Sequence, residues 1–267
     1  MHELPALELA ARLAAPLTAP AVRAWVDAAL DLIFPALCPV CDVPLGAGRR
    51  DPLCGGCWSG IGRIGPPLCT RCGRPDVPDV GEDPAAGDAV AAPECAACAL
   101  DPPPFHWARA AAVYEGPLRE ALHALKFRGK VALARPLAVL LLEQCAPARP
   151  ARLDAVIPVP LAPARERERG FNQATLLAGR VARAWGAPLR SGWLVRRRAT
   201  APQSDLGAEE RHANVRGAFA AASAVAGRHV VIVDDVLTTG ATAAECARAL
   251  LAQRAAGVGV VSVARVL

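Results

Sequence analysis

The sequence predicts an α/β domain with a mostly parallel sheet, preceded by a small cysteine-rich unit held together by metal. Four Cys-x-x-Cys pairs lie within residues 35–104 of the 267-residue chain, where Gly and Pro are frequent and hydrophobic periodicity is weak. From residue 105 onward, short apolar runs alternate with helical patterns, as in α/β proteins whose parallel sheets are covered on both faces. We therefore expect a helical segment over 1–34, the cysteine-rich unit over 35–104 and the α/β domain over 105–267.

Charge is divided unevenly along the chain. Residues 1–104 carry 7 basic and 13 acidic side chains, whereas residues 105–267 carry 23 basic and 12 acidic ones. The basic second part indicates an anionic ligand or partner. A hydrophobic content of 53% argues against a disordered chain. Because no apolar stretch reaches the ~20 residues of a membrane span and the first residues lack a signal-peptide pattern, we expect a cytoplasmic protein without membrane insertion.

The expected elements follow from apolar periodicity and from the Gly, Pro and capping residues between them. The N-terminal segment is rich in Ala and Leu, and its helical pattern ends near Pro35. In the α/β domain we expect strands over Ala108–Tyr114, Ala155–Val159, Arg228–Val233 and Val258–Val263. We expect helices over Pro117–Phe127, Val131–Gln144, Asn172–Trp185 and Ala241–Ala255.

The cysteine pairs have the spacing of zinc knuckles. A two-residue spacer lets both thiolates of a pair bind one Zn²⁺ at about 2.3 Å, and two pairs complete a tetrahedron. Eight ligands therefore suit two sites, built from Cys38, Cys41, Cys54, Cys57, Cys69, Cys72, Cys95 and Cys98. Zinc binding, worth roughly 10–16 kcal/mol per structural site, is enough to fold a segment with little core. Four thiolates leave no open position on the metal, so we expect its role to be structural.

Three other uses of these cysteines compete with zinc. Disulfides are typical of secreted proteins, and one redox-active pair does not account for four pairs in a row. Iron–sulfur clusters also take four cysteines. Zinc is the interpretation that we favour. The spacing leaves the order of pairing open between a sequential and a cross-braced arrangement.

The segment from Val230 to Thr242 indicates an anion site at the end of a strand. A buried strand leads to Asp234 and Asp235, and a short loop then opens a helix with Thr238, Thr239, Gly240, Ala241 and Thr242. Ligands of open α/β sheets bind at the carboxyl ends of the strands, and backbone N–H groups at a helix N-terminus bind phosphate. Carboxylates accept hydrogen bonds from ribose hydroxyls. A ribose 5-phosphate therefore fits both halves of the segment.

Two other kinds of phosphate site begin with a similar strand. P-loop NTPases need GxxxxGK[ST], and neither Lys126 nor Lys130 is followed by Ser or Thr. Receiver domains of response regulators need a later Asp as phospho-acceptor, and no Asp follows Asp235. An ordinary buried strand with a capped helix does not account for two adjacent aspartates at its end. The ribose-phosphate interpretation is the one that remains.

These motifs resemble those of a known family. Val230–Thr242 is similar to the phosphoribosyl pyrophosphate (PRPP) motif of type I phosphoribosyltransferases. Together with the cysteine pairs, three further motifs occur in the order found in the ComF family of competence-associated proteins, including its GntX-like members: Leu125–Gly129, Pro158–Leu161 and Arg169–Gln173. The resemblance covers roughly residues 34–267 and leaves residues 1–33 outside.

The resemblance implies a type I phosphoribosyltransferase-like fold that binds PRPP, with a double zinc ribbon before it. Asp234 and Asp235 would bind the ribose hydroxyls, and residues 238–242 would hold the 5′-phosphate. The pyrophosphate, carried with Mg²⁺, would lie beside the loop after the second strand, and its candidate neighbours are Lys126, Arg128, Pro160, Leu161, Arg165 and Arg169. The basic members of this set also suit a salt-bridged turn or the basic end of a helix. Neither the acceptor nor a catalytic residue is specified by the sequence.

The resemblance also implies a role in natural competence, as DNA uptake or use of imported DNA. Two alternatives stay open: an active phosphoribosyltransferase of nucleotide metabolism with an unknown acceptor, and a non-catalytic adaptor for single-stranded DNA or for proteins of the competence machinery. The basic run Arg196–Arg198 suits contact with nucleic-acid phosphates. A scaffold with a vestigial pocket is the weaker hypothesis, because every polar position of the pocket motif is present.

Overall fold

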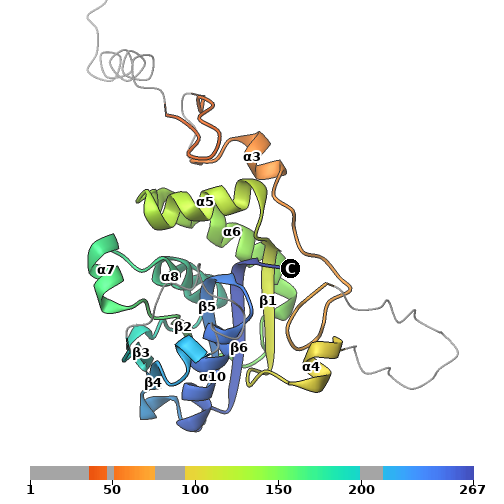
Figure 1. Ribbon diagram of the computed structural model, residues 1–267, viewed down its shortest axis with the longest axis vertical. Coiled ribbons are helices and arrows are strands. Elements are labelled where there is room, and N and C mark those ends of the chain that lie inside the picture. Colours follow the sequence, from red (N-terminus) through yellow and green to blue (C-terminus); the bar gives the residue numbers. More distant parts are fainter. Residues whose placement is uncertain (1–35, 47–50, 76–93, 199–212) are drawn as a thin grey trace, which may run out of the picture.

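One parallel sheet organises the chain (Figure 1). The computed structural model describes residues 36–46, 51–75, 94–198 and 213–267, and the helical segment expected over 1–34 lies outside this part. Four parallel strands pair in the order β1-β6-β5-β2. Their bounds are Trp107–Val113 (β1), Ala155–Pro158 (β2), His229–Leu237 (β5) and Gly257–Arg265 (β6). The α/β class and the four strands expected for it are confirmed.

Helices cover both faces of this sheet (Figure 1). Val231 and Val233 of β5 join the core on one face, whereas Val230 and Ile232 join the core on the other. The first face is covered by α5 (Gly116–Phe127), α6 (Ala134–Cys145) and α8 (Gln173–Trp185). The second face is covered by α10 (Ala241–Ala252). Burial on both faces explains why the strands read as continuous apolar runs.

Local sequence explains where the helix beside the site begins and ends. The Asn172 side chain accepts a hydrogen bond from the Ala174 N–H at 2.9 Å and so caps the start of α8. Gly186, with φ at 69°, adopts the left-handed conformation that closes the helix. Short 3₁₀ turns accompany the longer elements at Val131–Leu133, Ala146–Ala148, Ser191–Trp193 and Ser223–Val225.

Strand β5 is longer than the sequence predicts. The predicted strand ends at Val233 and leaves the two aspartates beyond it, but β5 continues to Leu237 and contains both. The reason is the neighbouring strand: β6 runs far enough to pair Ser262 with Asp234 and Arg265 with Leu237. The predicted end is therefore wrong, although both carboxyl groups still lie in the carboxyl-terminal part of the strand.

Three short elements beside the sheet were not predicted as such. Strands β3 (Leu194–Arg196) and β4 (Phe219–Ala221) form an antiparallel pair, and helix α7 (Pro163–Arg169) follows β2. The two strands, of three residues each, and the seven-residue helix carry too little periodicity to be recognised from sequence. They lie on the side of the sheet formed by its edge strand β2 (Figure 1).

The cysteine-rich unit lies along the edge strand β1. The Ile64 N–H donates to the Ala111 carbonyl at 3.0 Å, and the Val113 N–H donates to the Gly62 carbonyl at 2.8 Å. The unit has two short helices, α3 (Gly55–Ser59) and α4 (Ala96–Leu100), each beginning directly after a cysteine. Its backbone thus occupies polar groups of β1 that an edge strand would otherwise present to solvent.

One helical stretch is long and apolar enough to cross a membrane by length and composition. It spans Val131–Ala148, has a mean hydropathy of 1.3, and 44% of it is buried. Its main part, α6, packs against one face of the sheet, where Leu137, Leu140 and Leu141 are fully buried. Core helices of globular domains pass the same test.

Candidate functional site

The carboxyl ends of β5 and β2 lie side by side and bring together segments far apart in the sequence. Pro158 of β2 pairs with Val233 of β5, and the Val159 N–H donates to the Val233 carbonyl at 2.9 Å. The loop that follows, with Pro160 and Leu161, therefore begins beside Asp234 at the same edge of the sheet. This is the edge at which ligands of open α/β sheets bind.

Asp235 is the buried acid of the site. Its side chain lies in an ion pair in which Lys126 Nζ contacts Oδ2, and Gln173 Nε2 donates to Oδ1 at 3.3 Å. The residue is only 4% exposed. Burial alone would raise the pKa of Asp235, but the Lys126 ammonium outweighs it and holds that pKa below its usual range. Asp235 is therefore an ionised, paired carboxylate.

Asp234 lies in a different environment although it is the next residue. It is half-buried, and its Oδ1 accepts a hydrogen bond from the Asp235 N–H at 2.8 Å. Burial and the adjacent Asp235 carboxylate raise the pKa of Asp234 well above its usual range. The two neighbouring acids thus differ in their affinity for a proton, and Asp234 binds one more readily than Asp235 does.

The loop between β5 and α10 combines a left-handed glycine with the start of a helix. Gly240 adopts φ of 83°, in the left-handed region, and α10 begins at the next residue. The Ala241 N–H lies 3.3 Å from Thr239 Oγ1, and a Cβ added to Gly240 would meet no atom within 4 Å. The N-terminus of this twelve-residue helix, which carries the positive end of the helix dipole, therefore lies next to the loop.

Of the basic residues predicted near a pyrophosphate, Lys126 and Arg169 come to the acidic pair. Lys126 pairs with Asp235 itself. Arg169, at the end of α7, donates to Gln173 Oε1 at 2.6 Å, and its guanidinium lies 5.2 Å from the centroid of the Phe127 ring. Arg169 thus reaches Asp235 through Gln173.

Arg128 lies elsewhere. Its Nη2 donates to the Pro39 carbonyl at 2.6 Å, within the first cysteine pair and its spacer. The structure therefore directs Arg128 to the cysteine-rich unit, in spite of its two-residue separation from Lys126. Arg165, half-buried in α7, interacts electrostatically with Arg169 and stays near the site.

Two further residues lie at the site, and the sequence alone does not place either of them there. Gln173 is buried and joins Arg169 to Asp235, and it was visible as the last residue of the motif Arg169–Gln173. Arg196 of β3 is half-buried and interacts with the charges of Arg165 and Asp234. In the sequence Arg196 belongs to the basic run Arg196–Arg198. The sequence alone does not show that Arg196 is half-buried while Arg197 and Arg198 are exposed.

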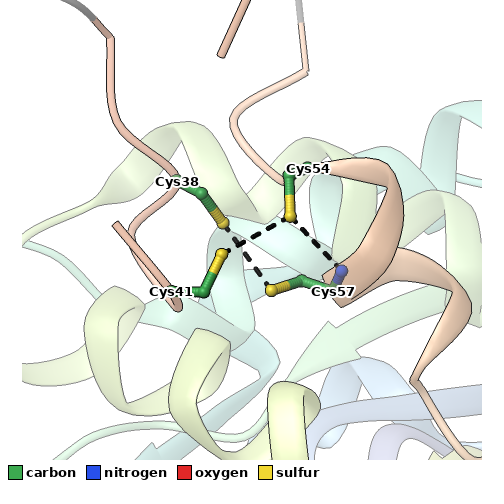
Figure 2. A group of neighbouring side chains, drawn as sticks. All are labelled: Cys38, Cys41, Cys54 and Cys57. Carbon is green, nitrogen blue, oxygen red and sulfur yellow. Dashed lines mark hydrogen bonds between the residues drawn. The ribbon is translucent and has the colours of Figure 1, made fainter. Parts of the chain in front are cut away.

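The first four cysteines form one compact cluster (Figure 2). Their sulfur atoms all lie within 4.8 Å of one another, with Cys38 and Cys57 at 3.8 Å and Cys41 and Cys54 at 3.5 Å. A zinc ion bound at about 2.3 Å in a tetrahedron separates its sulfurs by roughly 3.8 Å. The Cys57 N–H also points at Cys54 Sγ, at 3.3 Å. The cluster fits a structural zinc ion.

The last four cysteines form a second cluster of the same kind. All four are buried, and Cys72 and Cys95 lie 3.7 Å apart. The N–H groups of Cys72 and Cys95 point at Cys69 Sγ, at 3.5 and 3.3 Å. The structure thus pairs the knuckles in sequence, first with second and third with fourth. Cys145 and Cys246 are buried outside both clusters.

Comparison with known families assigns the cysteine-rich unit and the α/β domain to two separate domain families. Residues 29–99 match the family of the double zinc ribbon domain. Residues 172–266 match the family of the phosphoribosyl transferase domain. The second match contains α8, Asp234, Asp235 and the loop before α10.

Three known proteins illustrate the similarity. The chain is 38% identical over 240 residues to the DNA utilization protein YhgH of Escherichia coli O157:H7, covering 88% of this chain and 100% of that one. It is 30% identical to competence protein F of Haemophilus influenzae, covering 75% of this chain and 85% of the relative. Among solved structures, a glutamine PRPP amidotransferase from B. subtilis is 24% identical with a TM-score of 0.33, covering 48% of this chain and 25% of that chain. The 30% identity to competence protein F, 85% of which is covered, shows that the chain belongs to the ComF family, and in this chain a double zinc ribbon precedes a phosphoribosyl transferase domain.

Proposed function

We propose that the α/β domain binds PRPP or a related phosphoribosyl ligand, and that the protein acts in DNA uptake or in the use of imported DNA. The observation that carries the first part is the shared position of two features. The acidic pair Asp234–Asp235 and the open loop at Gly240 lie at one edge of the sheet, separated by only the end of β5. A single ligand with ribose hydroxyls and a phosphate can contact both the acidic pair and the loop.

In this proposal the carboxylates of Asp234 and Asp235 accept hydrogen bonds from the ribose 2′- and 3′-hydroxyls. The loop from Thr238 to Thr242 holds the 5′-phosphate at the N-terminus of α10. The pyrophosphate lies toward Pro160–Leu161 and the arginines Arg165 and Arg169. Mg²⁺, when bound with the pyrophosphate, would neutralise its charge and orient it. Asp235 stays ionised for its part because Lys126 pairs with it.

The reaction that such a site serves is displacement of pyrophosphate at the ribose C1 carbon. Positioning of the ligand and stabilisation of charge would account for most of the rate enhancement. Pyrophosphate release from PRPP in the presence of candidate bases, nucleotides or DNA measures whether the domain transfers a phosphoribosyl group and to what.

The DNA-related part of the proposal is supported by the relatives. One is named a DNA utilization protein and another a competence protein, and the first of these is matched along its full length. A second candidate function, an adaptor for single-stranded DNA, is favoured by the exposed arginines Arg167, Arg197 and Arg198 beside the site. Both functions are compatible with one bound phosphoribosyl ligand.

The substitution Gly240→Ala tests the phosphate loop. A Cβ at this position forces a side chain into the left-handed region and places it in the open space before α10. We expect the Kd for PRPP with Mg²⁺, measured by calorimetry, to rise roughly 10–100-fold, since charge-assisted hydrogen bonds contribute about 1.5–3 kcal/mol each.

Gly227→Ala is the matched control. Gly227 also has a positive φ, 70°, and open space around its Cβ position, but it lies in the turn before β5, at the other end of that strand. It carries the same backbone strain without touching the loop. Equal PRPP affinity in the two variants would contradict the placement of the 5′-phosphate.

Single-stranded DNA binding gives a separate prediction. If Arg197 contacts backbone phosphates, the affinity for an oligonucleotide falls steeply with salt, and Arg197→Ala reduces the slope of log K against log [salt] by about 0.7. Fluorescence anisotropy between roughly 50 and 200 mM salt measures this slope. Arg183→Ala, an exposed arginine on α8, should leave it unchanged. A salt-independent affinity excludes arginine–phosphate contacts as its basis.

A further inference from the structure

Two arginines of the sheet donate hydrogen bonds to backbone carbonyls beside the second cysteine cluster. Arg265, in β6, is 6% exposed, and its Nη1 donates to the Cys72 carbonyl. Arg109, in β1, donates through Nη1 to the carbonyls of Cys69 at 3.3 Å and Thr70 at 3.0 Å. Both guanidinium groups therefore bind the knuckle formed by Cys69 and Cys72.

These two cations have no carboxylate partner in the described part of the chain. The ion pairs found there involve other arginines and Lys126, and neither Arg109 nor Arg265 forms one. Arg265 Nε is also buried without a hydrogen-bond partner among the described residues. A buried charge is costly unless an opposite charge compensates it. Zinc bound by four thiolates carries two net negative charges, which equals the charge of the two guanidinium groups.

The knuckle is held against β1 by its backbone as well. The Ala108 N–H donates to the Arg71 carbonyl at 2.6 Å. Gly73, with φ of 72°, lies so close that an added Cβ would be 2.4 Å from the Ala108 carbonyl oxygen. This contact fixes the cluster at a short distance from both arginines.

Arg265 also connects the cluster to the loop at the other site. In the sheet it pairs with Leu237 of β5, the Val266 N–H donates to the Leu237 carbonyl at 3.0 Å, and the Tyr114 N–H donates to the Arg265 carbonyl at 2.7 Å. Leu237 directly precedes Thr238, the first residue of the loop. The side chain of Arg265 thus binds the knuckle while its backbone supports the strand end from which the loop departs.

We propose that Arg109 and Arg265 are the counter-ions of a zinc centre formed by Cys69, Cys72, Cys95 and Cys98, and that Arg265 couples this centre to the phosphate loop. The counter-ion role rests only on the contacts of Arg109 and Arg265 with the cluster. The coupling to the phosphate loop rests on the proposed phosphoribosyl site. Arg265 acts in it as a positioning residue, because its side chain does not reach the loop itself.

Metal retention tests the counter-ion role. In the full-length, zinc-loaded protein, Arg265→Met and Arg109→Met should each release one of two zinc ions to a chromogenic chelator about 10–100-fold faster than wild type, since outer-shell partners contribute that much to metal affinity. The other zinc ion should leave at the wild-type rate. Arg265→Lys keeps the charge and should fall between wild type and Arg265→Met.

Arg71→Met is the matched control. Arg71 belongs to the same knuckle, but it is about one-third exposed and pairs with Glu94 at 2.9 Å. Its loss should leave both release rates unchanged. Wild-type rates in Arg109→Met and Arg265→Met would overturn the counter-ion role, and so would equal acceleration by Arg71→Met. If Arg265→Met does not fold, Arg109→Met and Arg265→Lys decide the question.

Ligand binding by the same zinc-loaded variants tests the coupling. PRPP should bind several-fold more weakly to Arg265→Met and with wild-type affinity to Arg109→Met, because only Arg265 pairs with Leu237. Equal affinities in the two variants would overturn the coupling. If wild-type protein binds no PRPP, the proposed function fails, while the zinc-release result still judges the counter-ion role.

Discussion

Replacing Asp235 by asparagine should lower the free energy of unfolding at neutral pH by about 3–5 kcal/mol, whereas Asp234→Asn should not lower it. Asp235→Asn leaves the Lys126 ammonium, whose side chain is only 19% exposed, without its ion-pair partner. Asp234→Asn instead removes a carboxylate whose ionised form is disfavoured by burial and by Asp235. Urea unfolding of the two variants measures the difference between neighbouring residues of the same type.

The double variant Lys126→Met, Asp235→Asn separates the ion pair from general packing. Each single change leaves one buried partner unmatched, and the double change leaves none, so it should be more stable than the sum of the single effects predicts. Additive effects would show that Lys126 and Asp235 do not interact in the folded protein. An Asp234→Asn variant as unstable as Asp235→Asn would contradict the different environments of the two acids.

The pH dependence of stability provides a further readout of the same variants. The pKa of Asp235 is held below the unfolded value of about 3.9, so its contribution is complete above that pH and is lost as pH falls through the folded pKa. The raised pKa of Asp234 acts in the opposite direction, since its contribution is present at low pH and is lost as pH rises through the folded value. Asp235→Asn should therefore reduce the acid sensitivity of unfolding, and Asp234→Asn should not.

The substitution Cys69→Ser should remove one of two zinc ions and unfold the segment that covers β1. A structural zinc site contributes roughly 10–16 kcal/mol, which is comparable to or larger than the 5–15 kcal/mol that stabilises a typical domain. Without it the knuckle cannot hold its contact with Ala108. Metal analysis should find about one zinc ion instead of two, and amide hydrogen exchange should accelerate along β1.

Cys145→Ser is the control for loss of a buried thiol. Cys145 is buried in α6 and belongs to neither cluster. The Cys145→Ser variant should retain both zinc ions, and its amide hydrogen exchange along β1 should match that of wild type. Two zinc ions in Cys69→Ser, or unchanged exchange in β1, would contradict the structural role of the second cluster. Far fewer than two zinc ions in wild type would contradict both sites.

The parts of the fold predicted from sequence are those set by local chemistry. The β-branched run before Asp234 specifies a buried strand, and Asn172 specifies the start of a helix because its side chain caps the backbone there. The eight cysteines that act as metal ligands follow from the two-residue spacers. Their order of pairing does not, because it depends on how the segments between the knuckles fold.

The parts that sequence did not predict depend on contacts between distant segments. The end of β5 is set by the length of β6, and the position of Arg128 is set by the Pro39 carbonyl. Lys126 was expected near a pyrophosphate, yet its side chain pairs with Asp235, the acid proposed for the ribose. No local pattern distinguishes these outcomes. The roles assigned to Arg165, Arg169, Pro160 and Leu161 stay predictions that ligand binding by variants would decide.

The cover over β1 has a consequence for how the protein is made. A chain synthesised while zinc is scarce keeps the apolar sheet but lacks the segment around Gly62, Ile64 and Arg71 that occupies its outer edge. An open edge strand is a template for a strand of another chain. Zinc supply during expression should therefore govern the yield of monodisperse protein, and metal added after purification should not recover material that has already associated through this edge.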